Sequence, residues 1–107
     1  MVIHQYDIYL VNLDPTQGSE IKKTRPCVVV SPDDMNRHLR TVQIAPMTTN
    51  TTVYPWRAKI HFSRKKGMVA LDQLRTVDKR RLIRKLGKAT PSVTQDIKDI
   101  IHEMLVE

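Results

Sequence analysis

The stretch GSEIKKTRPCVVVS, residues 18–31, decides the fold because it leads from a charged segment into an unbroken apolar run. The run CVVVSP, residues 27–32, is rich in valine and apolar at successive positions, which is typical of a central strand buried on both faces. Arg25 stands directly in front of this run, and Pro26 restricts its backbone. An arginine in this place is either a solvated flank of the strand or a charge positioned to meet a ligand.

Two segments on either side of the central run also have the patterns of strands. Residues 7–13, DIYLVNL, alternate apolar and polar side chains, and the turn-forming pair Asp14-Pro15 ends them. Residues 41–47, TVQIAPM, predict another strand, which Pro46 interrupts.

Further along the chain, residues 56–62, WRAKIHF, alternate apolar and basic side chains and predict a half-buried strand with a basic outer face. Lys65, Lys66 and Gly67 predict a hairpin-like break, and residues 68–74, MVALDQL, the next strand.

Two short helices are predicted between these strands. The first covers residues 33–39, with Pro32 at its first position and Ser31 as its N-cap. The second covers residues 78–87, DKRRLIRKLG, because an aspartate begins this segment and a glycine ends it. Residues 86–90 are a candidate edge strand.

A C-terminal amphipathic helix is the clearest prediction. Ser92 and Gln95 form a capping-box pattern, and apolar residues follow at helical spacing. These residues are Val93, Ile97, Ile100, Ile101, Met104 and Leu105. We interpret them as core or dimer contacts. Together, the elements predict one α+β domain over residues 1–107, built on a small, curved antiparallel sheet or barrel with appended helices.

Positive charge is concentrated in one part of the chain. The net charge is +7, and residues 57–88 hold twelve of the eighteen Lys and Arg residues but only two of the eleven Asp and Glu residues. Such a block is typical of a surface that binds a polyanion, most often nucleic acid. A solubilising face or an acidic protein partner would produce the same pattern.

Several classes of protein are disfavoured. No apolar stretch is long enough to span a membrane, and the N-terminus lacks the pattern of a signal peptide, so we expect a cytoplasmic protein. The single Cys27 allows no intrachain disulfide. The histidines and carboxylates have no metal-ligand spacing, and no phosphate-binding glycine loop is present. We therefore expect no cofactor and no metal, so a nuclease of this kind would work without a metal ion.

Metal-free cleavage is easiest on RNA, whose 2′-OH is itself the nucleophile. The protein must then accept the 2′ proton, stabilise the charged phosphorane and supply a proton to the 5′ oxygen. Arg25 suits the second task because its guanidinium binds two phosphate oxygens and stays charged. Glu20 lies five residues earlier, across a turn that contains Gly18. The two side chains either face one groove or form a plain surface ion pair.

The threonine-rich segment PMTTNTT, residues 46–52, is a second candidate, because hydroxyl groups at the end of a strand can bind a phosphate. The alternative is an ordinary capped loop. Tyr54 and Trp56 follow this loop and could stack on unpaired bases, although we expect Trp56 to lie in the core.

Five segments together resemble the MazF/PemK-type toxins of type II toxin–antitoxin systems. They are DPTQGSE, KTRPCVVVS, APMTT, YPWRAKI and VALDQLRTVDKRRL, and they cover almost the whole chain in order. The resemblance implies an SH3-like barrel and a homodimer with RNA in a groove at its interface. It also implies an mRNA interferase, which cuts single-stranded RNA at a short sequence without ribosome or metal and leaves 2′,3′-cyclic phosphate and 5′-OH ends. A cognate antitoxin with an acidic, disordered tail would occupy the groove.

The resemblance also implies roles for individual residues. The catalytic positions fall on Arg25, Thr48 and Glu20. Thr24 stands where some relatives have histidine. The positions expected to bind RNA are Ser19, Lys23, Thr24, Thr49, Asn50, Trp56, Asp72, Gln73 and Arg75.

Two other functions compete with the ribonuclease. Gyrase-poisoning toxins share the fold but act through a C-terminal Trp-Gly-Ile, whereas this chain ends in EMLVE. A basic RNA-binding module without catalysis is compatible with the charge and the fold.

Overall fold

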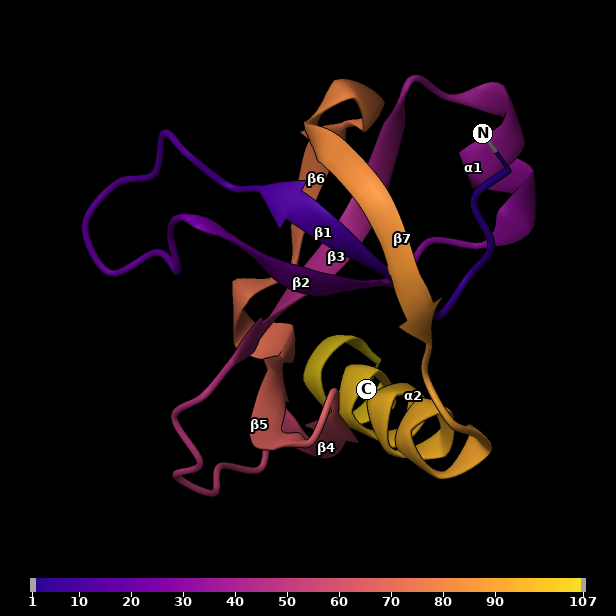
Figure 1. The fold of residues 1–107 in the computed structure, drawn as a ribbon. Helices are drawn as coiled ribbons and strands as arrows, with labels where there is room; N and C mark the ends of the chain where they lie inside the picture. Colours follow the sequence, from indigo (N-terminus) through magenta and orange to yellow (C-terminus); the bar gives the residue numbers. More distant parts are fainter. Residues whose placement is uncertain (1, 107) are drawn as a thin grey trace.

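The chain forms a curled antiparallel sheet with a long C-terminal helix packed against it (Figure 1). The computed structural model describes residues 2–106. The elements in chain order are β1 (Asp7–Asn12), β2 (Thr24–Val29), α1 (Asp33–His38), β3 (Thr41–Thr48), β4 (Arg57–Phe62), β5 (Lys65–Ala70), the 3₁₀ turn η1 (Leu71–Gln73), β6 (Arg75–Asp78), the 3₁₀ turn η2 (Lys79–Arg81), β7 (Leu82–Lys88) and α2 (Pro91–Leu105).

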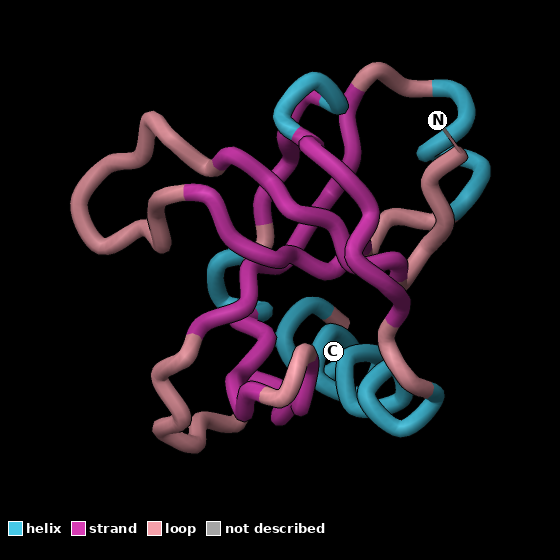
Figure 2. The backbone as a smooth tube through the Cα atoms, viewed as in Figure 1, coloured by secondary structure: helices cyan, strands magenta, loops and turns pink. Residues whose placement is uncertain are grey.

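The strand β3 joins the two parts of the sheet. The strand order is β4-β5-β3-β2-β1-β7, and β6 pairs with the first half of β3. Residues Thr41 to Ile44 of β3 pair with β6, whereas Met47 and Thr48 pair with β5. Two register shifts between β1 and β7 add to the curl, because a bulge bends a strand and increases its twist. The result is a half-barrel above the β4–β5 hairpin and α2 (Figure 2).

The sheet separates two apolar cores, and β2 contributes to both. The first core fills the curled part of the sheet and contains Cys27 and Val29. The second core lies between the sheet and α2 and contains Val28, Val30 and Ile97. Successive side chains of a strand point to opposite faces, so an apolar run without alternation is what this position requires.

The predicted fold class is confirmed: the protein is α+β, with a curved antiparallel sheet and a C-terminal amphipathic helix. The predicted strands over residues 7–13, 41–47 and 56–62 correspond to β1, β3 and β4.

The boundary of the central strand was predicted three residues too late. β2 begins at Thr24, so Arg25 lies within the strand, opposite Val11 of β1. Ser31 is not the N-cap of α1, which begins after Pro32 without a side-chain cap. Instead, the Ser31 hydroxyl is buried, donates to Asn36 and accepts a hydrogen bond from the Gln43 N–H.

The predicted helix over residues 78–87 is wrong. Asp78 does cap a turn, since its carboxylate accepts the Arg80 N–H at 2.8 Å, but only the three residues of η2 follow. Residues Leu82–Lys88 then form β7, which pairs with β1. Leu82 and Leu86 are four residues apart, a spacing that fits one face of a helix as well as one face of a strand. Pairing with β1 selects the strand.

The hairpin and the strand after it are also displaced from their predicted places. The turn is formed by Ser63 and Arg64, both with positive φ, and Phe62 pairs with Lys65. This is the backbone that a two-residue hairpin requires. The segment predicted as one strand over 68–74 divides between β5 and η1, and β6 follows.

The C-terminal helix α2 starts earlier than its capping-box pattern predicts. Thr90 is the N-cap, with its hydroxyl accepting the Val93 N–H at 3.3 Å, and Pro91 is the first helical residue. The apolar stripe packs into the second core as far as Ile101, whereas Met104 and Leu105 are exposed.

Shortening a side chain on the helix side of β2 tests the two-core arrangement. Val28→Ala removes two buried methyl groups and leaves a cavity, so the free energy of unfolding in urea should fall by about 2 kcal/mol. Val2→Ala, at an exposed position, should change it by less than about 0.5 kcal/mol. Equal effects of the two substitutions would contradict this account of the core.

Candidate functional site

A hollow of about 430 Å³ lies where the half-barrel meets the β4–β5 hairpin. Residues from β1, β2, β3, β4, β5 and β7, from the loop after β3 and from the hairpin turn line it. They are Leu10, Arg25, Pro26, Met47, Thr48, Thr49, Phe62, Ser63, Lys65, Lys66, Gly67, Arg84 and Leu86. The hollow therefore unites Arg25 with Thr48 and Thr49, which the sequence had assigned to two separate motifs.

Arg25 is held in this hollow by main-chain carbonyl groups. Its Nε donates to the Lys22 carbonyl at 2.9 Å, and its Nη1 donates to the Met47 carbonyl at 3.2 Å. Both of these hydrogen-bond partners are uncharged main-chain carbonyls. Among residues 2–106, no carboxylate forms an ion pair with Arg25. The guanidinium is thus fixed in place while its positive charge stays available to a ligand.

Thr48 is placed beside Arg25 by the end of β3. It pairs with Met68 of β5, and its hydroxyl accepts the Asn50 N–H at 3.2 Å. Gly67 of β5 lies so close that a Cβ at this position would be 2.7 Å from the Thr48 carbonyl oxygen. The glycine therefore sets the distance between β5 and the Thr48 backbone.

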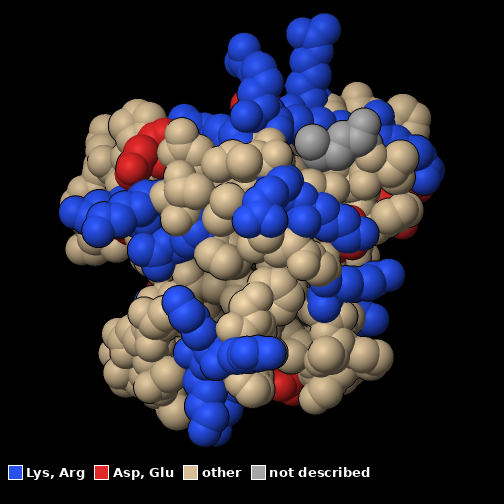
Figure 3. Space-filling view, viewed as in Figure 1, with Lys and Arg blue, Asp and Glu red and all other residues tan. Residues whose placement is uncertain are grey.

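The hollow is strongly basic. Arg25, Lys65, Lys66 and Arg84 line it, and no Asp or Glu within the described part of the chain does so. Lys and Arg side chains spread over much of the face shown in Figure 3, where Asp and Glu occupy only small areas. A site of this composition attracts an anion with several charges, such as the phosphates of a nucleic acid strand.

Glu20 is not brought to Arg25. Its Oε1 accepts the Gln17 N–H at 2.6 Å within the β1–β2 loop, next to Gly18 with φ of 55°. Among residues 2–106, Glu20 neither lines the hollow nor forms an ion pair with Arg25, so neither expected arrangement, the shared groove or the ion pair, is present.

Ser19, Lys23 and Thr24 belong to the same region and are exposed. Ser19 lies in the β1–β2 loop, and Thr24 begins β2. Lys23 has φ of 74° and its N–H binds Asp14 Oδ1 at 3.1 Å, which leaves its side chain on the surface.

Two of the predicted contact residues brace the β1–β2 loop. Gln73 Oε1 accepts the Ile21 N–H at 3.1 Å, and Arg75 Nη1 donates to the Leu13 carbonyl at 3.1 Å. Neither residue lines the hollow. These contacts tie η1 and β6 to both ends of the loop that carries Ser19 and Glu20, and so give Gln73 and Arg75 a positioning role.

An aromatic pair stands beside the threonine-rich loop. The rings of Tyr54 and Trp56 are stacked, with centroids 5.3 Å apart and an interplanar angle of 11°. Arg57 lies over the Tyr54 ring and binds Asp72 through two hydrogen bonds of 3.1 and 3.2 Å. Trp56 is 42% exposed, so the expectation that it lies in the core is wrong.

The rest of the threonine-rich loop is ordered by local hydrogen bonds. Asn50 Oδ1 accepts both the N–H and the hydroxyl of Thr52. Thr49 lines the hollow, whereas Asn50 does not.

Sequence reasoning missed the cations contributed by β5 and β7. Lys65 and Lys66 had been assigned to a turn and Arg84 to a helix, so none was placed in a site. The density of Lys and Arg over residues 57–88 was the available signal, but it did not identify which of them face Arg25.

Three further properties of residues 2–106 complete the description. No group of three or more His, Cys, Asp or Glu side chains is arranged to hold a metal ion. The described helices are all too short or too polar to span a membrane. Burial raises the pKa of the Cys27 thiol to about 12, with Arg25 and Arg75 opposing this shift.

Residues 4–105 match a family of PemK-like, MazF-like toxins of type II toxin–antitoxin systems. The chain belongs to this family. Endoribonuclease MazF of Staphylococcus saprophyticus subsp. saprophyticus is 34% identical to it over 101 residues, which are 89% of this chain and 84% of that protein.

Solved MazF structures share the fold. MazF from Deinococcus radiodurans superposes with a TM-score of 0.88 at 25% identity, over 100% of this chain and 99% of that one. A mycobacterial endoribonuclease in complex with its cognate antitoxin gives a TM-score of 0.82 at 24% identity, over 96% and 94% of the two chains. The curled sheet with its C-terminal helix is thus the fold of MazF-like toxins.

The close contact between Gly67 and Thr48 can be tested by adding one methyl group. Gly67→Ala should lower the free energy of unfolding by about 1–3 kcal/mol, because the new Cβ meets a backbone oxygen that cannot move alone. Gly87→Ala should cost less, because its Cβ meets the movable Phe62 ring at 3.1 Å. Urea unfolding of both variants checks this order, and the reverse order would contradict the role assigned to Gly67.

Proposed function

We propose that this MazF-like toxin is a sequence-specific endoribonuclease that cleaves single-stranded mRNA independently of ribosomes and metal ions. The observation that carries the proposal is the placement of Arg25. Its guanidinium is anchored by two carbonyls beside Thr48, in a hollow with four cations and no lining carboxylate among the described residues. The endoribonuclease name of a 34% identical relative supports the same reaction.

In the proposed reaction, the 2′ oxygen of the nucleotide before the cut attacks its own 3′ phosphate. The new bond joins the 2′ oxygen to phosphorus while the bond from phosphorus to the 5′ oxygen breaks. The products are a 2′,3′-cyclic phosphate and a 5′-OH end. Negative charge that develops on the phosphoryl oxygens is stabilised by Arg25 and by the Thr48 hydroxyl, both fixed before the substrate arrives.

Among the described residues, no Asp or Glu lines the hollow, so the hollow itself offers no carboxylate for proton transfer. Glu20 is the nearby carboxylate that the family resemblance places among the catalytic positions, but it accepts the Gln17 N–H and does not line the hollow. A role for Glu20 therefore requires the β1–β2 loop to move toward Arg25 when RNA binds. Gln73 and Arg75, which hold this loop, then control its position.

Single-stranded RNA fits this surface better than a duplex. Exposed, stacked Tyr54 and Trp56 offer a flat aromatic surface on which an unpaired base can stack. Ser19, Lys23, Thr24, Thr49, Asn50 and Asp72 remain the further residues proposed to contact RNA.

The proposed partners follow from the family. We infer a cognate antitoxin whose acidic, disordered tail competes with RNA for the cations of the hollow. A crystal structure of a MazE–MazF complex from Deinococcus radiodurans has the same fold. We also infer a homodimer, to which the exposed Met104 and Leu105 at the end of α2 offer apolar surface, and a cytoplasmic location.

Removing the guanidinium tests the catalytic centre. Arg25→Ala should reduce cleavage of a long single-stranded RNA by at least ~10²-fold, because it removes a preorganised charge that stabilises the transition state. Cleavage by the unmodified protein should persist in EDTA. Arg37→Ala is the control, since Arg37 pairs with Asp34 outside the hollow.

Full activity of the Arg25 variant would refute this mechanism. RNA binding without any cleavage by the unmodified protein would favour a binding module instead. Gyrase-dependent breaks in DNA would favour the gyrase-poisoning function.

The dependence of RNA binding on salt tests the four cations of the hollow. A plot of the logarithm of the association constant against the logarithm of the salt concentration should have a slope of about −3. Each phosphate contact on a single strand contributes about −0.7, and the hollow has four cations. Lys65→Ala should make the slope shallower by about 0.7. Filter binding of an uncleavable RNA between about 50 and 200 mM salt measures it, and a flat response would mean that these cations face away from RNA.

A further inference from the structure

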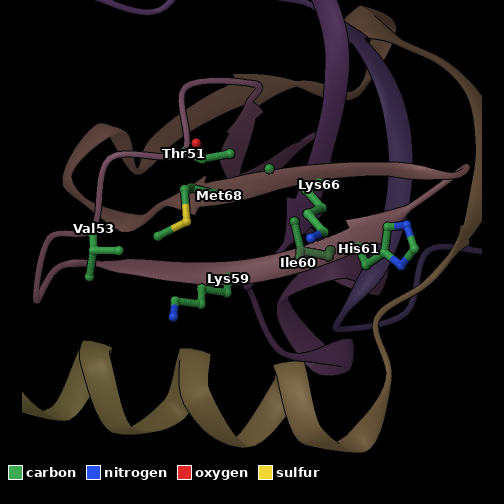
Figure 4. Close-up of a pocket in the computed structure, with 8 residues that line it drawn as sticks. Thr51, Val53, Lys59, Ile60, His61, Lys66 and Met68 are labelled. Atoms are coloured by element: carbon green, nitrogen blue, oxygen red, sulfur yellow. The ribbon is translucent and has the colours of Figure 1, made fainter.

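Two of the four cations of the hollow, Lys65 and Lys66, come from the tip of the β4–β5 hairpin. Both are exposed, and they follow directly after the two-residue turn of Ser63 and Arg64. The hairpin lies alongside α2, with Lys66 and His61 toward its turn (Figure 4). The positive charge that faces Arg25 therefore depends on where this tip is held.

The sheet holds the hairpin at a distance from its tip. Among residues 2–106, β3 pairs with β5 at Met47 and Thr48, and Thr48 pairs with Met68. A strand rises about 3.3 Å per residue, so Lys65 lies about 10 Å along β5 from this last pair. A two-stranded hairpin is only marginally stable by itself in water. The two lysines are fixed in place only if the tip has a contact of its own.

Phe62 makes such a contact. It is the last residue of β4, pairs directly with Lys65 and is partly buried against the second core. A Cβ on Gly87 would be 3.1 Å from Cε1 of the Phe62 ring and 3.4 Å from its Cζ, so the edge of the ring lies directly over the Gly87 backbone. The ring thus joins the tip of the hairpin to β7, the last strand on the other side of the hollow.

The local structure of β7 leaves room for this ring. The register between β1 and β7 shifts so that Leu86 is the extra residue of a bulge, directly before Gly87. A glycine inside a strand is typical of a place where another group approaches closely. Leu86 lines the hollow and packs against the same core as Phe62. The two walls of the hollow, β7 and the hairpin, therefore meet at the Phe62 ring.

We propose that Phe62 is a positioning residue of the site. Its side chain lines the hollow but has no group that binds a phosphate or transfers a proton. Docked over Gly87, the ring holds Lys65 and Lys66 where they bind the same RNA strand as Arg25. The inference rests on the proposed ribonuclease function, since it assigns these two lysines to RNA phosphates.

The salt dependence of binding to an uncleavable RNA tests this role. Phe62→Ala leaves all four cations in the chain, yet the slope should become shallower, from about −3 to about −1.5, because two of them lose their places. In cleavage assays, KM for RNA should rise while kcat changes little, because Arg25 and Thr48 stay where they are.

A double substitution shows whether Phe62 acts through the lysines. Lys65→Ala should make the slope shallower by about 0.7 in the unmodified protein. In the Phe62→Ala background the same change should have almost no further effect, since Lys65 has already lost its contact with RNA.

Three further variants separate positioning from stability. Ile101→Ala shortens a partly buried side chain of the same core on α2, so it should lower the midpoint of urea unfolding without changing the slope. Phe62→Leu keeps an apolar side chain against Gly87 and should restore a slope near that of the unmodified protein. Gly87→Val forces the ring from its place while Phe62 and all four cations remain, so it should make the slope shallower even where Phe62→Ala does not fold.

The outcomes distinguish this inference from the proposed function. An unchanged slope in folded Phe62→Ala or Gly87→Val would overturn the positioning role, even if activity fell. An equally large change of slope in Ile101→Ala, or a full additional effect of Lys65→Ala in the Phe62→Ala background, would overturn it as well. Absence of RNA cleavage by the unmodified protein, measured separately, would refute the ribonuclease function itself.

Discussion

Burial of β2 on both of its faces is the constraint on which the rest of the structure depends. Cys27 and Val29 belong to the core inside the curled sheet, whereas Val28, together with Val30 just after the strand, belongs to the core under α2. One strand thus fixes the half-barrel and the helix relative to each other. Arg25 lies in the same strand, two residues before Cys27, so the packing of β2 also holds the Arg25 backbone in place. A charge held in this way loses little freedom when it binds a phosphate.

The arrangement of cations around Arg25 follows from the same topology. β3 brings Thr48 to β5, and β5 brings Lys65 and Lys66 to the edge of the half-barrel. On the opposite side, β7 pairs with β1 and contributes Arg84. Positive charge from distant parts of the sequence therefore meets where the two halves of the sheet join.

Sequence reasoning succeeded where local pattern and tertiary contact agree. The valine run predicted a strand buried on both faces, and the apolar spacing of α2 predicted a helix that covers a core. It failed over residues 82–88 because Leu82 and Leu86 fit two periods, and only pairing with β1 selects the strand. It failed for Trp56 because an apolar residue in an alternating segment was read as buried, whereas Trp56 stacks on Tyr54 at the surface. The family resemblance named Arg25 and Thr48, but only the register of β2 and β3 shows that Arg25 binds the carbonyl next to Thr48.

The central claim is that this hollow positions an RNA phosphate for attack by the neighbouring 2′-OH. Its most direct test is an RNA that contains a single 2′-deoxy nucleotide immediately before the cut. In the proposed mechanism Arg25 and the other cations bind phosphate. This RNA should therefore bind with nearly unchanged affinity, yet cleavage at the modified bond should disappear. Cleavage at that bond at the normal rate would show that water or another nucleophile attacks, and would contradict the mechanism.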